Sequence, residues 1–142
     1  MSDVDMDLSS GIAAFEAKNF SRAMQLLSPL AEKGAPEAQF RLAIMAQIGL
    51  GMVKNCAVAV RWMQAAAEQG YALAQHGLGF MYFQGECTKN DAAEAAKWFQ
   101  RAADQGLAGS SATLAMMYEQ GLGVPRDEAA AKRLRAQAER GA

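Results

Sequence analysis

Few residues of this chain have the side-chain chemistry that a catalytic or metal site requires. His76 is the only histidine among 142 residues, and no aspartate, glutamate or cysteine lies at helical spacing from it in the same predicted helix. A histidine base needs an orienting acid and a nearby nucleophile, and a metal site needs about three or four converging ligands. We therefore interpret His76 as a residue that lines a groove. We predict no catalytic residue, no metal site and no cofactor.

Two glycine-containing segments superficially resemble phosphate-binding loops, namely Gly49-Leu50-Gly51 and Gly121-Leu122-Gly123. A dinucleotide loop follows a β-strand, and a P-loop ends in Gly-Lys-Ser or Gly-Lys-Thr. Neither context is present, because the chain has no useful stretch of period-2 apolar alternation that would predict a strand. These glycines are therefore predicted to form turns.

A repeat of 36 residues supplies the elements that position all of these side chains. The segment from Trp62 to Gly70 returns as the segment from Trp98 to Gly106. A period of this length is typical of a helical solenoid, in which each unit packs only on its neighbours. Glycines that close successive units follow nearly the same step: Gly34, Gly70, Gly106 and Gly141.

Each unit is predicted to contain two helices joined by a glycine-rich turn. Asn55, Asp91 and Asp127 precede the second helices, and their short side-chain oxygens can accept hydrogen bonds from the first helical turn. The glycine that closes a unit is expected to adopt a left-handed conformation after the helix ends. We predict one repeat domain over residues 1–142, with units at approximately 7–35, 36–71, 72–107 and 108–142.

Three motifs point to a known repeat family. They are Ala74-x-x-x-Leu78-Gly79-x-x-Tyr82-x-x-Gly85, Ala95-x-x-Trp98-Phe99-x-x-Ala102-Ala103-x-Gln105-Gly106, and Gly121-x-Gly123-Val124-Pro125-x-Asp127. Over roughly residues 36–142 the chain resembles the Sel-one-like repeat family, behind a first unit with tetratricopeptide-like spacing. The resemblance implies an all-α, right-handed α-solenoid of four helix-turn-helix repeats. It further implies a scaffold for protein complexes, without catalytic residues.

The larger side chains favour packing over ligand binding. Trp62 and Trp98 share one repeat position beside alanine pairs, so we expect them to fill the core between units. The methionines Met45, Met81 and Met117 also share one position and are expected in the core.

Composition and charge exclude several classes of function. The chain is 51% hydrophobic and 20% charged, so it is not disordered. Its net charge of −1 gives no electrostatic basis for binding nucleic acid or a membrane surface. Residues 1–18 carry four acids against one lysine, whereas residues 126–142 carry a net charge of +2. We therefore expect a monomer or weak head-to-tail self-association.

The start of the chain and the cysteines bear on its compartment. Residues 1–7 are acidic and lack the apolar core of a signal peptide, and no apolar run approaches the roughly 20 residues that span a bilayer. These features predict a soluble, cytoplasmic protein, in which Cys56 and Cys87 are expected to be free thiols. A disulfide between them requires Cα atoms within about 7 Å.

The first helices of the units carry a second apolar stripe besides the one that packs into the stack. Helices that are apolar all round are either buried on every side or offer one side to a partner. We predict a concave groove that holds a peptide or helix of another protein, with Phe80 and Phe83 at its centre. The predicted groove residues are Phe15, Phe40, Ile44, Ile48, Leu73, His76, Phe80, Phe83 and Met116.

Two other functions stay open beside this adaptor role. One is an inhibitor or immunity-type protein that caps a partner enzyme or toxin. Some bacterial members of the family resemble proteins with that role. The remote alternative is an enzyme that binds or hydrolyses β-lactam-like compounds, as in a few secreted relatives. No nucleophile, base and oxyanion arrangement is evident in the sequence to support the enzyme.

Overall fold

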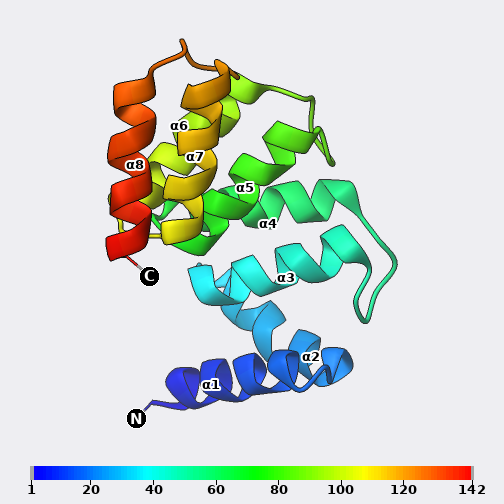
Figure 1. Cartoon of the computed structure of the whole chain (residues 1–142). Helices are drawn as coiled ribbons and strands as arrows, with labels where there is room; N and C mark the ends of the chain where they lie inside the picture. Colours follow the sequence, from blue (N-terminus) through cyan, green and yellow to red (C-terminus); the bar gives the residue numbers. More distant parts are fainter. Residues whose placement is uncertain (1, 142) are drawn as a thin grey trace. The chain divides into compact units, whose positions relative to one another are not determined.

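The computed structural model describes residues 2–141, and within this range the chain forms eight α-helices and no strand (Figure 1). This confirms the all-α prediction. The helices are α1 (Asp3–Glu16), α2 (Phe20–Glu32), α3 (Pro36–Ile48), α4 (Cys56–Glu68), α5 (Ala72–Gln84), α6 (Ala92–Asp104), α7 (Ala108–Gln120) and α8 (Glu128–Arg140). No helix in the described range is long and apolar enough to cross a membrane.

The helices form hairpins that correspond to the sequence repeat. The chain divides into two compact units, Met1–Tyr71 and Ala72–Ala142. In the first unit α1 packs on α2 and α3 packs on α4, and α2 joins the hairpins by packing on α3. In the second unit α5 packs on α6, α7 packs on α8, and α6 contacts α7. The same arrangement of two hairpins is thus built twice.

The predicted caps explain where the second helices begin. The side chains of Asn19, Asn55, Asp91 and Asp127 each accept a hydrogen bond from a backbone N–H three residues ahead, at 3.0–3.3 Å. Because these bonds satisfy donors that the first turn leaves free, each helix starts at a defined residue. The predicted helix starts at Asn55, Asp91 and Asp127 are confirmed, and Asn19 caps α2 in the same way.

The unit-closing glycines follow the prediction except at the end of the chain. Gly34, Gly70 and Gly106 have φ values of +99°, +93° and +92°, in the left-handed region that favours glycine. Gly141 has a φ of −86°, so the prediction of a left-handed residue is wrong there. The reason is local, because the Gly141 N–H still donates a helical hydrogen bond to the Gln137 carbonyl at 2.9 Å.

The core contains the side chains that the repeat pattern assigned to it. Met45, Met81 and Met117 are completely buried, as expected. Trp62 and Trp98 are also buried, and an arginine lies over each indole ring: Arg61 at 4.3 Å and Arg101 at 4.4 Å from the ring centroid. The interpretation of both tryptophans as packing residues agrees with this burial.

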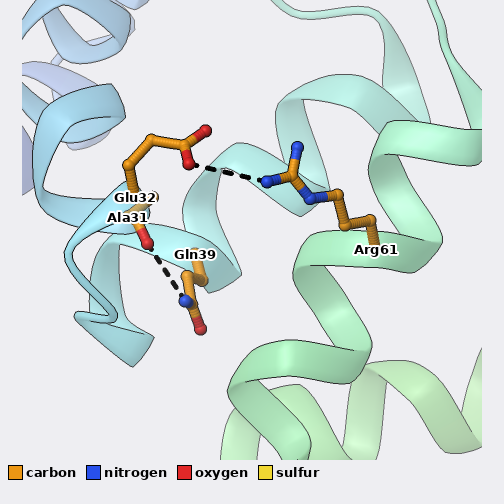
Figure 2. A network of polar contacts seen from close by, with 4 residues as sticks. All are labelled: Ala31, Glu32, Gln39 and Arg61. Atoms are coloured by element: carbon orange, nitrogen blue, oxygen red, sulfur yellow. Dashed lines mark hydrogen bonds and ion pairs between the residues drawn. The ribbon is translucent and has the colours of Figure 1, made fainter.

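A chain of glutamine hydrogen bonds ties neighbouring helices together. In Figure 2, the Gln39 amide on α3 donates to the Ala31 carbonyl on α2 at 3.1 Å. Gln69, which caps α4, donates to Gln39 Oε1 at 2.9 Å. The Arg61–Glu32 ion pair, at 3.5 Å, connects α4 with α2 in the same view. The buried amide of Gln39 is therefore paired, which avoids the cost of an unsatisfied polar group.

The second unit builds a similar set of bonds with one substitution. Gln105 donates to Gln75 Oε1 at 2.9 Å, as Gln69 does to Gln39. In the last repeat Ser111 stands where Gln39 and Gln75 stand. The donor to the Ala103 carbonyl is instead Gln137 on α8, at 2.7 Å. A hydrogen bond between the two hairpins is thus present in this unit too, but its donor lies on α8 instead of α7.

The two cysteines depart from the sequence prediction. Cys56 and Cys87 are both disulfide-bonded, and the described residues contain no free thiol. The prediction of free thiols is therefore wrong for this structure. That prediction rested on the expected compartment and on no geometric argument, and the compartment is only indirectly encoded in a sequence.

Candidate functional site

The predicted groove residues of the second unit lie on one face of two neighbouring helices. Leu73, His76, Phe80 and Phe83 are spaced three or four residues apart on α5, which places them on one side of that helix. Their counterparts 36 residues later on α7 are Gly109, Ala112, Met116 and Glu119. We call the surface formed by Leu73, His76, Phe80, Phe83, Gly109, Ala112 and Met116 the α5–α7 face.

An aromatic group forms the centre of the α5–α7 face. The His76 and Phe80 rings meet edge-on with centroids 5.0 Å apart, and both contact the ring of the fully buried Phe99 on α6, at 5.3 Å and 5.5 Å. Such edge-to-face contacts fix the orientation of each ring. His76 and Phe80 remain half-buried, so their outer edges reach solvent.

The other residues of the face differ in how much of them is available to a partner. Phe83 and Met116 are half-buried and pack, together with Phe80, against the buried cluster of the second unit. Leu73 is 43% exposed, and Ala112 is exposed on α7. The face therefore has an aromatic floor that belongs partly to the core and a rim of exposed apolar atoms.

A polar pair lies beside the aromatic group. His76 Nδ1 and Ser110 Oγ form a hydrogen bond of 2.6 Å between α5 and α7. Burial lowers the pKa of His76 from its ordinary value of 6.5, because the charged imidazolium loses hydration. The Ser110 side chain is fully buried, so its hydroxyl does not reach a substrate in solvent. The pair positions the His76 ring and does not form a nucleophile with its base.

The predicted groove residues do not include Gly109 and Ser110, which the structure places beside His76. A Cβ atom added to Gly109 would lie 3.7 Å from His76 Cε1, an ordinary van der Waals contact, so the glycine leaves room for a methyl group beside the imidazole. The signal was present as breaks in the repeat: Gly109 stands where Leu73 stands one unit earlier, and Ser110 where alanine stands. Where a residue differs in size from its counterparts in the other repeats, the shape of the surface also differs.

In the first unit, the aromatic residues predicted for the groove make ring contacts with residues outside the predicted groove. The Phe15 ring meets Phe20 at 5.8 Å, and the Phe40 ring meets Tyr71 at 5.5 Å. Phe15, Phe40 and Ile44 are half-buried, whereas Ile48 at the end of α3 is 62% exposed. Ile48 is thus the most exposed of the predicted groove residues in this unit.

Among the described residues, no group of three or more histidine, cysteine, aspartate or glutamate side chains lies close enough together to hold a metal ion. The described side chains also leave no buried nitrogen or oxygen atom without a hydrogen-bond partner.

Helical hairpins that recur at a fixed repeat length are the architecture of α-helical repeat proteins of the solenoid class. Four segments of the chain match the family model of the Sel1 repeat, namely residues 11–34, 36–71, 72–107 and 112–138. The chain belongs to the Sel1 repeat family. The first hairpin, which has tetratricopeptide-like spacing in sequence, is itself matched as a Sel1 repeat.

Two solved structures share this fold over nearly the whole chain. A Sel1 repeat protein from Oxalobacter formigenes is 31% identical, with a TM-score of 0.89 over 94% of this chain and 55% of its own. The protective antigen c5321 of uropathogenic Escherichia coli strains, which displays an SLR fold, is 30% identical, with a TM-score of 0.90 over 96% of this chain and 30% of its own. This chain thus spans about half or less of the length of these two relatives.

Comparison with functionally curated proteins gave no match. Sel1 repeat proteins are generally protein-interaction scaffolds and are typically not enzymes. At this level the predicted class of function, a repeat protein that binds other proteins, agrees with the family.

Proposed function

We propose that this chain is a non-catalytic protein-interaction scaffold, and that the α5–α7 face holds a helix or an extended peptide of a partner protein. The observation that carries this proposal is the combination of a fixed aromatic floor with a glycine beside it, where no side chain covers the imidazole edge. His76 and Phe80 are held against the buried Phe99, and Gly109 leaves room next to the imidazole.

The properties of this face suit an apolar side chain of the partner. The rings are already oriented, so binding them costs little conformational entropy. The lowered pKa of His76 favours the neutral imidazole, which presents an apolar edge at neutral pH. Leu73 and Ala112 supply further exposed apolar atoms at the rim. We infer that an apolar side chain of the partner contacts the exposed ring edges next to Gly109.

The remaining predicted groove residues belong to the same proposal. Ile48 is the most exposed of them at 62%, and Phe15, Phe40 and Ile44 are half-buried like the aromatic floor of the α5–α7 face. We propose that they provide a second apolar contact for the same kind of partner.

The test uses exposed residues, because Phe80 and Phe83 also pack on the core and their loss would lower stability whatever their role in binding. The double variant L73K/A112E places charges on the face at two exposed positions. The matched control is L122K, which adds a charge at an equally apolar residue in the α7–α8 turn that is 36% exposed. Thermal unfolding should give nearly equal Tm values for all three proteins.

Affinity capture from an extract of the source cells, quantified by mass spectrometry, then compares the three proteins. We expect a protein that is retained by the wild type and by L122K and is reduced at least about tenfold on L73K/A112E. A partner that all three proteins retain equally would place the binding surface elsewhere. If no protein distinguishes the wild type from an unrelated bait, the scaffold proposal itself fails.

A further inference from the structure

A second surface of the unit Ala72–Ala142 combines an apolar floor with a cationic rim. A pocket of about 470 Å³ lies between α6 and the α7–α8 turn. Its floor includes Ala93, Ala96, Tyr118 and Val124, and Lys97 and Arg101 stand one helical turn apart at its edge. We call this the α6 pocket. It is separate from the α5–α7 face and does not depend on the proposed function.

The wall of the α6 pocket is held in place by a close backbone contact. Gly123 has a φ of +71°, and a Cβ atom added to it would lie 2.3 Å from the Ala92 carbonyl carbon. The backbone of the α7–α8 turn therefore rests directly on the first turn of α6, which only glycine permits. The pocket is preformed, so a ligand does not have to open it.

Charge and polarity select the kind of ligand. Among the described residues that line the α6 pocket, none is acidic. Lys97 has a carboxylate neighbour in Glu94 at 3.6 Å, but the pair is exposed and such pairs contribute little. Arg101 lies over the Trp98 indole, 4.4 Å from the ring centroid. The pocket thus suits a segment that places an aliphatic side chain between carboxylates.

A second pocket of this unit is a poorer site for such a segment. It has a volume of about 480 Å³ and lies between the end of α7 and the start of α8. Glu119 and Glu128 line it, and both already pair with arginines, Arg135 at 2.5 Å and Arg126 at 2.8 Å. Its lining holds two carboxylates beside three cations, whereas the α6 pocket is lined by two cations and no carboxylate, so an acidic ligand meets less repulsion in the α6 pocket. Although α8 is basic, the pocket beside it is therefore a less favourable site for an acidic partner than the α6 pocket.

The chain itself carries a segment with the required chemistry. Helix α1 begins Asp3-Val4-Asp5-Met6-Asp7, in which acidic and aliphatic residues alternate. All three aspartates are exposed, and Val4 and Met6 are 47% and 54% exposed. We propose that the first two turns of α1 dock into the α6 pocket of a second copy of the chain, with Val4 or Met6 on the apolar floor and the aspartates beside Lys97 and Arg101.

Sedimentation velocity tests this on the full chain, from about 10 µM to about 1 mM protein and at about 50 mM and about 500 mM salt. We expect reversible association that weakens at the higher salt. The variants K97E/R101E and D3K/D7K should each weaken self-association at least about tenfold. When these two variants are mixed, the reversed charges face each other and association should return. V4S/M6S keeps the charges but removes the aliphatic groups, and it should also weaken association.

The matched control is K132E/R133E, which reverses two exposed cations on α8 outside the α6 pocket. We expect no effect on association from it. A wild-type chain that stays monomeric over the whole range would overturn the proposal. So would association that K132E/R133E abolishes while K97E/R101E leaves it unchanged, or a mixture of the two charge-reversed variants that fails to associate. Circular dichroism of each variant confirms that the substitutions at exposed positions leave the fold intact.

Discussion

His76 joins the two chemical features of the α5–α7 face. On one side its Nδ1 is hydrogen-bonded to the buried Ser110, and on the other its ring meets Phe80 edge-on. Neither contact leaves the imidazole free to rotate. Histidine side chains titrate near neutral pH in most proteins. Here the His76 imidazole is held in place on an apolar surface, where burial favours its neutral form.

The lowered pKa of His76 makes stability depend on pH in a known direction. The folded chain binds a proton at His76 less readily than the unfolded chain, so stability falls as pH falls through the ordinary value near 6.5 toward the lower folded pKa. We expect Tm to decrease as the pH falls below about 6.5. In H76Q, which keeps a polar group near Ser110, this decrease should be smaller. An identical pH profile for both proteins would contradict the assignment.

The cysteines give a second prediction at this scale. Because Cys56 and Cys87 are both disulfide-bonded, thiol titration of unreduced, denatured protein should find no reactive thiol, and reduction should expose two per chain. Protein taken directly from cells is the informative sample, since disulfides persist mainly in oxidising compartments. Free thiols in that sample would contradict the structure and would favour the cytoplasmic location expected from the sequence.

At the scale of elements, the turns fix how each hairpin meets its neighbour. The clearest case is the α7–α8 turn, where the Gly123 backbone rests on Ala92. Gly51 makes a similar close contact in the other unit, because a Cβ atom there would lie 2.5 Å from Phe20 Cβ. In both units, the glycine at this position of the turn thus contacts the first residue of the second helix of the preceding hairpin.

Two glycine substitutions separate the cost of this contact from the cost of the backbone conformation. Gly106 also has a positive φ, but a Cβ atom added there meets nothing within 4 Å. G106A should therefore lose only about 1–2 kcal/mol, the cost of a left-handed non-glycine residue. G123A should lose about 1–3 kcal/mol more, because the turn must move off α6. Urea unfolding measures both, and equal losses would show that the close contact is not needed.

The elements were predictable from sequence where the cause is local. Asp91 and Asp127 begin helices because a short side-chain oxygen needs only the next few residues, and the repeat multiplied that signal. The compensation at Ser111 was not predictable, since the replacing donor, Gln137, lies on another helix. The His76–Ser110 bond joins residues 34 positions apart and likewise depends on how α5 and α7 pack.

At the scale of the whole molecule, the repeat period predicted the correct fold class because most units share markers, and the motifs between Ala74 and Asp127 pointed to the family. The amount of each stripe that remains exposed could not be predicted in the same way. Phe80 and Leu73 belong to one predicted stripe, yet Phe80 packs on the core and Leu73 is 43% exposed. Exposure depends on the size of the residues on the neighbouring helix, and Gly109 in place of a leucine changes it locally.

The central claim is that the α5–α7 face contacts a partner protein, and a site-specific photocrosslink tests it most directly. A photoreactive phenylalanine analogue is placed in the full chain at Ala112, which is exposed on this face, or at Ala129, which is exposed on α8. After irradiation in the source cells, we predict a covalent adduct with another protein from position 112 and none from position 129. An adduct from position 129 alone, or from neither position, would contradict the claim.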